Sequence, residues 1–366
     1  MRIGLTSPFG HPDVWRGAER YCRELSTWLG QQGHDATWLV TTTGETRMAT
    51  LEPEGVRVRY QHRSLDRGWG ADRYDVFLRC IIPIARGIRA SDFQVIEAHH
   101  YVDAAAVRLA RRGRTPYVMW IPGLPRKASL AGLPLHKAAF RFAVQGAARL
   151  HCLSEFARAG LAREMGLEAE VVRPGVDTSR YAGPRPGGQP MVLCTAAPGD
   201  PRKRVDLLVS AFPAILQRVP DARLVLASQD AEVATRMLDS LPDAARRHAE
   251  VANNPSLDLL AELYRSAAVS VLPSVDEAFG LVLVESLAAG TPVVASDRGA
   301  GGEIISTEDV GRLFAHDDIS SLVDSIVDTM KMSSDAATAR RCREHATHWD
   351  WSRVGAELEE IYSALL

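Results

Sequence analysis

Two short apolar runs frame a helix-length segment in the second half of the chain. Residues 269–273 and 292–297 are rich in β-branched side chains and each contains a proline at one end, so we expect both to be buried parallel strands. Between them, residues 279–289 are almost continuously apolar, and Gly290 and Pro292 follow. Glycine and proline commonly end a helix, so this segment is predicted to be one. The stretch is therefore predicted to form a strand, turn, helix and strand.

The same alternation runs through the rest of the chain. Residues 3–6 and 36–41 have strand patterns, and a loop at 7–17 and a helix at 18–29 are predicted between them. Further strand-like runs occur at 93–98, 117–121, 191–195 and 224–227. Alternating strands and helices predict an α/β protein with doubly wound parallel sheets. In such sheets ligands bind beyond the carboxyl ends of the strands.

The length of the chain predicts more than one domain. A single core seldom grows to 366 residues, so we expect two domains. Residues 183–190 hold three prolines and three glycines, which is the composition of a linker. We therefore predict an N-terminal domain at 1–182, a C-terminal domain at 191–345, and a helix at 346–366 that packs back across both domains.

Composition excludes several classes of protein. The net charge of −2 gives no electrostatic argument for nucleic-acid binding. The five cysteines are scattered without Cys-x-x-Cys spacing, so neither a zinc site nor a disulfide framework is indicated. A strand-like run begins at residue 2 and no stretch of eighteen apolar residues occurs, so we expect a cytoplasmic location.

Two glutamates give the central unit its candidate chemistry. Glu277 lies in the turn after a strand, where the ligand crevice of a parallel sheet is expected. Glu285 lies inside an apolar helix, and a buried carboxylate needs a partner or a ligand. A nearby Arg or Lys is one alternative. The other is a ligand whose hydroxyls bind the carboxylates while its anionic group meets the helix N-terminus, which describes a sugar nucleotide.

The setting of these glutamates resembles a known family. The pattern Pro273-Ser274-x-x-Glu277-x-Phe279-Gly280 and the string at 285–295 resemble the signature of the retaining family-4 glycosyltransferases. The resemblance implies the GT-B fold, in which two Rossmann-like doubly wound parallel-sheet domains face each other across a central cleft. The C-terminal domain would then bind the nucleotide sugar and the N-terminal domain the acceptor.

The resemblance also implies a role for each matched residue. Glu277 would bind hydroxyls of the donor sugar, and Glu285 those of the ribose. Lys203 matches the diphosphate-binding lysine and would neutralise the charge that grows on the β-phosphate. Further donor contacts would come from the backbone at Gly17, Phe279, Gly280 and Leu281.

The sequence departs from the family pattern at two places. The expected arginine falls at Ala197 or Pro198, and either Arg202 or Arg204 would replace it. The family's histidine on the N-terminal domain is missing near Pro122. His99, at the carboxyl end of a predicted strand, is therefore our candidate for part of its work.

These features predict a retaining transferase that moves a sugar from a nucleoside-diphosphate sugar to a hydroxyl of a small molecule, a natural product or a glycan or lipid precursor. We expect no metal and no cofactor apart from the donor substrate, because protein cations and the helix dipole carry out the neutralisation. A non-catalytic nucleotide-sugar binder and a GT-B sugar-nucleotide epimerase are the alternatives. The basic segment at 126–149 is more typical of a solvated helix, and a weak membrane-surface contact is the alternative. The oligomeric state is left open.

Overall fold

A computed structural model describes residues 1–10, 17–64, 75–111, 114–124, 132–186 and 190–366. The chain divides into two compact units. Unit 1 comprises Met1–Gly175 together with Trp351–Leu366, and unit 2 comprises Val176–Asp350. The division lies before the predicted linker at 183–190, because the short helix α8 (Thr178–Tyr181) packs against the helices of unit 2. Residues 187–189 of that linker are outside the described part of the chain.

Unit 1 is built on one eight-stranded sheet in the order β3-β4-β2-β1-β5-β6-β7-β8. Every neighbouring pair is parallel except β3 with β4. The strands are β1 (Arg2–Thr6), β2 (Asp35–Thr42), β3 (Arg47–Leu51), β4 (Val56–His62), β5 (Val95–Ala98), β6 (Tyr117–Ile121), β7 (Arg149–Cys152) and β8 (Glu170–Val171). The helices are α1 (Gly17–Gln31), α2 (Asp75–Leu78), α3 (Ile81–Arg89), α4 (Tyr101–Arg111), α6 (Pro134–Gly146), α7 (Glu155–Met165) and α17 (Trp351–Ser363).

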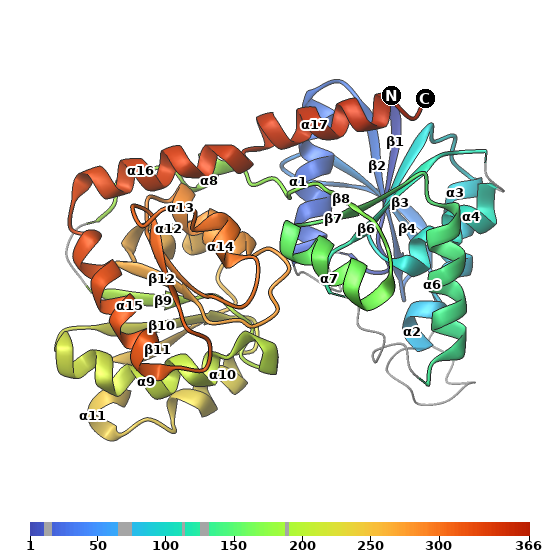
Figure 1. Cartoon of the computed structure of the whole chain (residues 1–366). Coiled ribbons are helices and arrows are strands. Elements are labelled where there is room, and N and C mark those ends of the chain that lie inside the picture. Colours follow the sequence, from blue (N-terminus) through green and yellow to red (C-terminus); the bar gives the residue numbers. More distant parts are fainter. Residues whose placement is uncertain (11–16, 65–74, 112–113, 125–131, 187–189) are drawn as a thin grey trace. The chain divides into compact units, whose positions relative to one another are not determined.

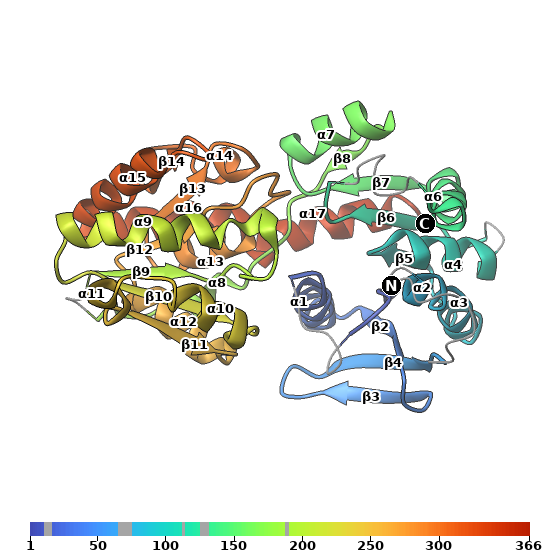
Figure 2. The ribbon, with the colours of Figure 1, turned by 90° about the horizontal axis from the view of Figure 1, so that it is seen from below.

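Helices cover both faces of this sheet. Figure 2 shows α1 and α17 on one side, and α3, α4 and α6 on the other. The amphipathic segment that we predicted near the C-terminus is α17, and its buried side chains belong to the same hydrophobic core as Ile3 and Leu5 of β1. The last helix of the chain is thus a structural part of the first unit, and the two labelled ends of the chain lie near each other in Figure 1.

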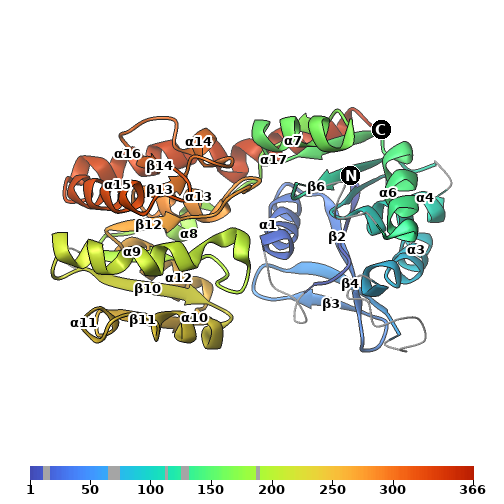
Figure 3. The ribbon, with the colours of Figure 1, turned by 60° about the horizontal axis from the view of Figure 1, so that its bottom comes forward.

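Unit 2 holds a parallel six-stranded sheet in the order β11-β10-β9-β12-β13-β14. The strands are β9 (Met191–Cys194), β10 (Arg223–Ser228), β11 (Ala249–Asn253), β12 (Val269–Leu272), β13 (Val293–Ser296) and β14 (Gly311–Phe314). The helices are η1 (Pro201–Lys203), α9 (Val205–Arg218), α10 (Ala231–Leu238), α11 (Asp243–Arg246), α12 (Leu257–Ser266), α13 (Leu281–Ala288), α14 (Gly301–Ile304), α15 (Ile319–Met332), α16 (Ala336–Ala346) and η2 (Thr347–Trp349). Figures 1 and 3 show α9 and α15 packed side by side on one face, while α12, α13 and α16 cover the other.

The central unit predicted from the sequence is present as β12, α13 and β13. Its apolar strands are buried along their whole length, as expected for strands covered on both faces. Within the described residues, no helix is long and apolar enough to cross a membrane. All five cysteines are buried and free of disulfide bonds.

Candidate active site

Three loops of unit 2 meet at the carboxyl ends of neighbouring strands. The loop after β12 is bound by the loop after β9, since the Val275 N–H donates to the Arg202 carbonyl at 2.8 Å. The loop after β13 binds it from the other side: the Asp276 N–H donates to the Arg298 carbonyl, and the Ala300 N–H donates to the Glu277 carbonyl, both at 2.9 Å. Glu277 is therefore held by its backbone at the edge of the sheet where ligands of parallel sheets bind.

Lys203 and Glu277 form an ion pair in this place. The Lys203 Nζ lies 2.5 Å from Glu277 Oε2, and the two side chains are 22% and 18% exposed. Lys203 is the last residue of the 3-10 turn η1, which Asp200 caps by accepting a hydrogen bond from the Arg202 N–H. The structure thus brings together the two residues to which the sequence assigned the leaving-group and sugar contacts.

Arg202 and Arg204, the two candidate replacements for the missing arginine, each form an ion pair with an aspartate. Arg202 forms an ion pair with Asp200. Burial acts to raise the pKa of Asp200, but hydrogen bonds and charge from Arg202 outweigh it and lower the pKa. Arg204 has a left-handed backbone with φ of 48° and pairs with Asp317. The contacts of these two arginines therefore do not show which one replaces the cation expected at Ala197 or Pro198.

Glu285 is buried and has a partner that we did not predict. It is 1% exposed, and the Tyr264 hydroxyl donates to its Oε2 at 2.9 Å. The same hydroxyl lies 3.1 Å from Thr195 Oγ1 at the end of β9. A phenol from α12 therefore contacts this carboxylate. Tyr264 is a polar aromatic residue in an apolar helix pattern, and that was the only signal for it.

The helix α13 begins at the residues predicted to meet the donor. Gly280 is its N-cap, with φ of 102°, a conformation that side chains disfavour. A Cβ at Gly280 would lie 3.1 Å from Leu272 Cδ2, so space is also restricted. Phe279 is buried, and Leu281 is the first helical residue. The first N–H groups of the helix have no partner inside it and form its positive end.

Gly17 is the first residue of α1 in unit 1 and is exposed. Residues 11–16, which include most of the glycine-bearing loop before it, lie outside the described residues. The prediction that the Gly17 backbone approaches a diphosphate therefore stays a prediction.

His99 lies beside a buried carboxylate of unit 1. It follows β5 but is only 3% exposed, and its Nε2 lies 3.0 Å from Oε1 of the fully buried Glu97. The Tyr362 hydroxyl of α17 donates to the other oxygen of Glu97. The side chain thus packs beside Glu97 in unit 1, and its contact with a donor or acceptor stays a prediction.

His100 turns toward the following helix. Its Nδ1 accepts from the Val102 N–H at 3.4 Å, and its ring stacks on Phe77 at 4.8 Å between centroids. Burial, with a smaller effect from His136, lowers the pKa of His100 to about 3. Pro122, where the family has its histidine, is exposed.

Two family models match this chain. Residues 15–180 match the model described as Glycosyltransferase Family 4, and residues 189–332 match the model described as Glycosyl transferases group 1. The chain is a glycosyltransferase. Among relatives of this glycosyltransferase is the phosphatidyl-myo-inositol mannosyltransferase of Mycolicibacterium smegmatis, 26% identical over 383 residues that cover 100% of this chain and 94% of the relative. A glycogen synthase of Mycobacterium tuberculosis is 28% identical over 404 residues, with 100% and 95% covered.

Solved structures share the fold of this glycosyltransferase. Sucrose-phosphate synthase of Thermosynechococcus elongatus has a TM-score of 0.82 at 19% identity, with 99% of this chain and 98% of that chain covered. Anabaena HepE, solved with UDP and glucose, has a TM-score of 0.78 at 16% identity, with 99% of each chain covered. At these identities the likeness concerns the fold alone, and it confirms the predicted GT-B class.

The described residues contain no cluster of three or more His, Cys, Asp or Glu able to hold a metal ion.

Proposed function

We propose that this glycosyltransferase moves a hexose from a nucleoside-diphosphate sugar to a hydroxyl group with retention of the anomeric configuration and without a metal ion. The observation that carries the proposal is the Lys203–Glu277 pair at the carboxyl end of β12, beside the N-terminus of α13. A cation, a carboxylate and a positive helix end together suit a diphosphate joined to a polyol.

In the proposed reaction, the bond between the anomeric carbon and the β-phosphate oxygen breaks and its electron pair stays on that oxygen. Lys203 and the first N–H groups of α13 stabilise this charge where it develops, which is how preorganised donors lower a barrier. The acceptor oxygen attacks from the same face, and its proton passes to the departing phosphate. Glu277 holds sugar hydroxyls, and Glu285 binds hydroxyls of the ribose.

The proposed donors follow from what the relatives are said to use. One mycobacterial relative is named as GDP-mannose-dependent, HepE was solved with UDP and glucose, and a starch synthase with a matching fold was solved with ADP and acarbose. We therefore propose GDP-mannose, UDP-glucose and ADP-glucose as the donors to test first. The acceptor remains a small molecule, a natural product or a glycan or lipid precursor, and the cytoplasmic location remains a prediction.

The test is an assay of each donor with a chelator present and absent, in which both transfer and donor hydrolysis are followed. We expect one donor to be consumed, at the same rate with the chelator, and NMR of the product to show a retained anomeric configuration. Tight donor binding without turnover would favour the non-catalytic binder, and a new nucleotide sugar without free nucleotide would favour the epimerase. Loss of turnover with the chelator would overturn metal independence.

A further inference from the structure

A pocket in unit 1 lies at the edge of the sheet opposite to the one where ligands of parallel sheets bind. Its volume is about 710 Å³. The residues Thr115, Pro116 and Tyr117 lead into β6, and Ala148 precedes β7, so the pocket lies at the amino ends of these strands. The expected ligand crevice is at the carboxyl ends. The pocket is therefore separate from the candidate active site, which is built on unit 2.

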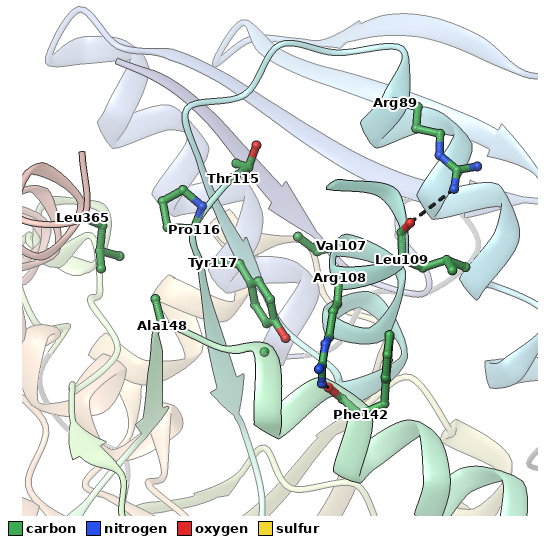
Figure 4. A pocket seen from close by; sticks show the side chains of 11 residues that line it. Arg89, Val107, Arg108, Leu109, Thr115, Pro116, Tyr117, Phe142, Ala148 and Leu365 are labelled. Atoms are coloured by element: carbon green, nitrogen blue, oxygen red, sulfur yellow. Dashed lines mark hydrogen bonds between the residues drawn. The ribbon is translucent and has the colours of Figure 1, made fainter. Parts of the chain in front are cut away.

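Two arginines line this pocket and are held by backbone carbonyl groups. Arg89 donates to the Leu109 carbonyl at 3.2 Å, and Arg108 donates to the Phe142 carbonyl at 2.5 Å (Figure 4). The Arg108 guanidinium also lies 4.2 Å from the centre of the Phe142 ring. Among the described residues, neither arginine has a carboxylate at ion-pair distance. Both cations therefore keep further N–H donors that can bind an anion.

The stretch of sequence that supplies most of the pocket lining is basic. Residues 76–154 contain twelve Lys and Arg and only three acidic residues, in a protein with a net charge of −2. Glu97 and Asp103 are fully buried, and Asp92 pairs with Arg2. Such a local excess of positive charge attracts anions toward the pocket.

The rest of the lining is apolar or aromatic. Val107, Leu109, Phe142 and Leu365 line it, and Leu109 and Phe142 are 39% and 40% exposed. Gly146 leaves room for the side chains of Arg108 and Tyr117, because a Cβ at this position would lie 2.5 Å from Arg108 Cδ and 2.7 Å from the Tyr117 hydroxyl oxygen. The pocket thus combines two separate arginines with an apolar wall (Figure 4).

We propose that this pocket binds an amphipathic oxyanion, namely a phosphate group that carries a hydrocarbon portion. The phosphate binds Arg108, and the hydrocarbon lies against Phe142, Leu109 and Leu365. This chemistry belongs both to soluble alkyl phosphates and to anionic lipid headgroups. The proposal does not depend on the donor or on the transfer reaction.

Calorimetry with hexyl phosphate tests the proposal. Inorganic phosphate supplies the charge without the hydrocarbon, and hexyl glucoside supplies the hydrocarbon without the charge. We expect hexyl phosphate to bind at least about tenfold more tightly than either, because only it makes both kinds of contact. Equal binding of all three, or no binding of hexyl phosphate, overturns the proposal.

Variants locate the binding. Arg108→Met should weaken hexyl phosphate binding about tenfold, the usual effect of losing a charged hydrogen bond. Arg141→Met is the matched control, because it removes an exposed charge from α6 that does not line the pocket. Circular dichroism verifies that each variant is folded. Equal losses in Arg108→Met and Arg141→Met would show attraction by charge alone and would overturn the assignment of the pocket.

Sedimentation with phosphatidylcholine vesicles, with and without phosphatidylglycerol, distinguishes the two sources of the ligand. Retention on the anionic vesicles that Arg108→Met abolishes assigns the pocket to a lipid headgroup. Binding of hexyl phosphate without vesicle retention assigns it to a soluble phosphate. Vesicle retention that Arg108→Met leaves unchanged, together with no binding of hexyl phosphate, rejects the pocket as the site.

Discussion

The side chains of Lys203 and Glu277 form an ion pair in the candidate active site. Both were predicted from the family pattern, and the structure places their charged atoms 2.5 Å apart. Because both side chains keep about a fifth of their surface exposed, a donor can replace their mutual contact by contacts of its own. In the absence of a donor, Lys203 and Glu277 each satisfy the charge of the other.

The first residue-scale prediction concerns Lys203→Ala. Removing one preorganised donor from a developing oxyanion typically costs about 10²–10³ in turnover, and we expect that loss here with saturating donor. The fold should survive, since the side chain is not in the core. Lys331→Ala is the control, because Lys331 is an exposed lysine on α15 of the same unit and pairs with Asp328. Near-normal turnover of Lys203→Ala, or an equal loss in the control, would remove Lys203 from the mechanism.

A second residue-scale prediction concerns pH. His100 has a folded pKa of about 3, below its unfolded value of about 6.5. The unfolded chain therefore binds this proton first, so the stability due to neutral His100 is complete above about pH 6.5 and falls as the pH drops toward 3. Between about pH 7 and pH 4.5 the wild type should lose about 2 kcal/mol more than His100→Asn does.

Urea unfolding of both proteins at the two pH values measures this difference. His62→Asn, which changes an exposed histidine of the same unit, should keep the wild-type pH dependence. The assignment to His100 fails if His100→Asn loses as much stability on acidification as the wild type does.

The two histidines after β5 show that the sequence predicts the position of a side chain along a strand but not its surroundings. The strand and its carboxyl end were predicted, and from them His99 was expected at a crevice. The partners that bury it could not be predicted, because Tyr362 lies 265 positions from Glu97 in the sequence and reaches it only when α17 packs on unit 1. Local patterns predict the strand, but the environment of a polar side chain at its end depends on distant segments.

At the scale of elements, the unit of β12, α13 and β13 could be predicted because every local signal agreed. Apolar β-branched runs formed the strands, and Gly290 followed the helix with φ of 85°. The left-handed Arg204 was not predicted, since nothing in its residue type requires φ of 48°. The contact between Tyr264 of α12 and Glu285 of α13 was not predicted either, because it joins two different helices.

Gly280→Ala tests the start of α13. The positive φ and the nearby Leu272 side chain disfavour a Cβ, so we expect a loss of about 1–2 kcal/mol in the free energy of unfolding and a weaker affinity for nucleotide. Gly30→Ala in α1 is the control, because a Cβ there meets no atom within 4 Å. Thermal unfolding and nucleotide titration measure both effects. A Gly280→Ala protein as stable as the control would show that the turn accommodates a side chain.

At the scale of the whole molecule, α17 determines whether unit 1 is complete. Its Trp351 donates to Glu24 at 2.9 Å, and Gly355 packs so closely on Trp28 that a Cβ would lie 2.4 Å from that ring. Val354 and Leu358 are buried in the same core. Unit 2 has no segment from this part of the chain.

A chain that ends at Asp350 should therefore lose the fold of unit 1 and keep that of unit 2. Each buried apolar side chain contributes about 1.5–3 kcal/mol, and α17 buries several, which is comparable to the whole stability of a domain. Hydrogen exchange should show unprotected amides in residues 1–175 and native protection in 176–350. Nucleotide binding should persist in part. A chain lacking only the exposed Leu366 is the control, and native protection of residues 1–175 in the shorter chain would contradict this account.

The division of unit 1 into two segments of the chain also determines when this unit can finish folding during synthesis. A growing polypeptide exposes the surface that α17 covers, around Tyr21 and Trp28, while all of Val176–Asp350 is still being translated. At 5–20 residues per second this interval is roughly 10 to 35 seconds. Unit 2 is contiguous and can fold on emergence, so the part of the protein that is synthesised first is the part that finishes folding last.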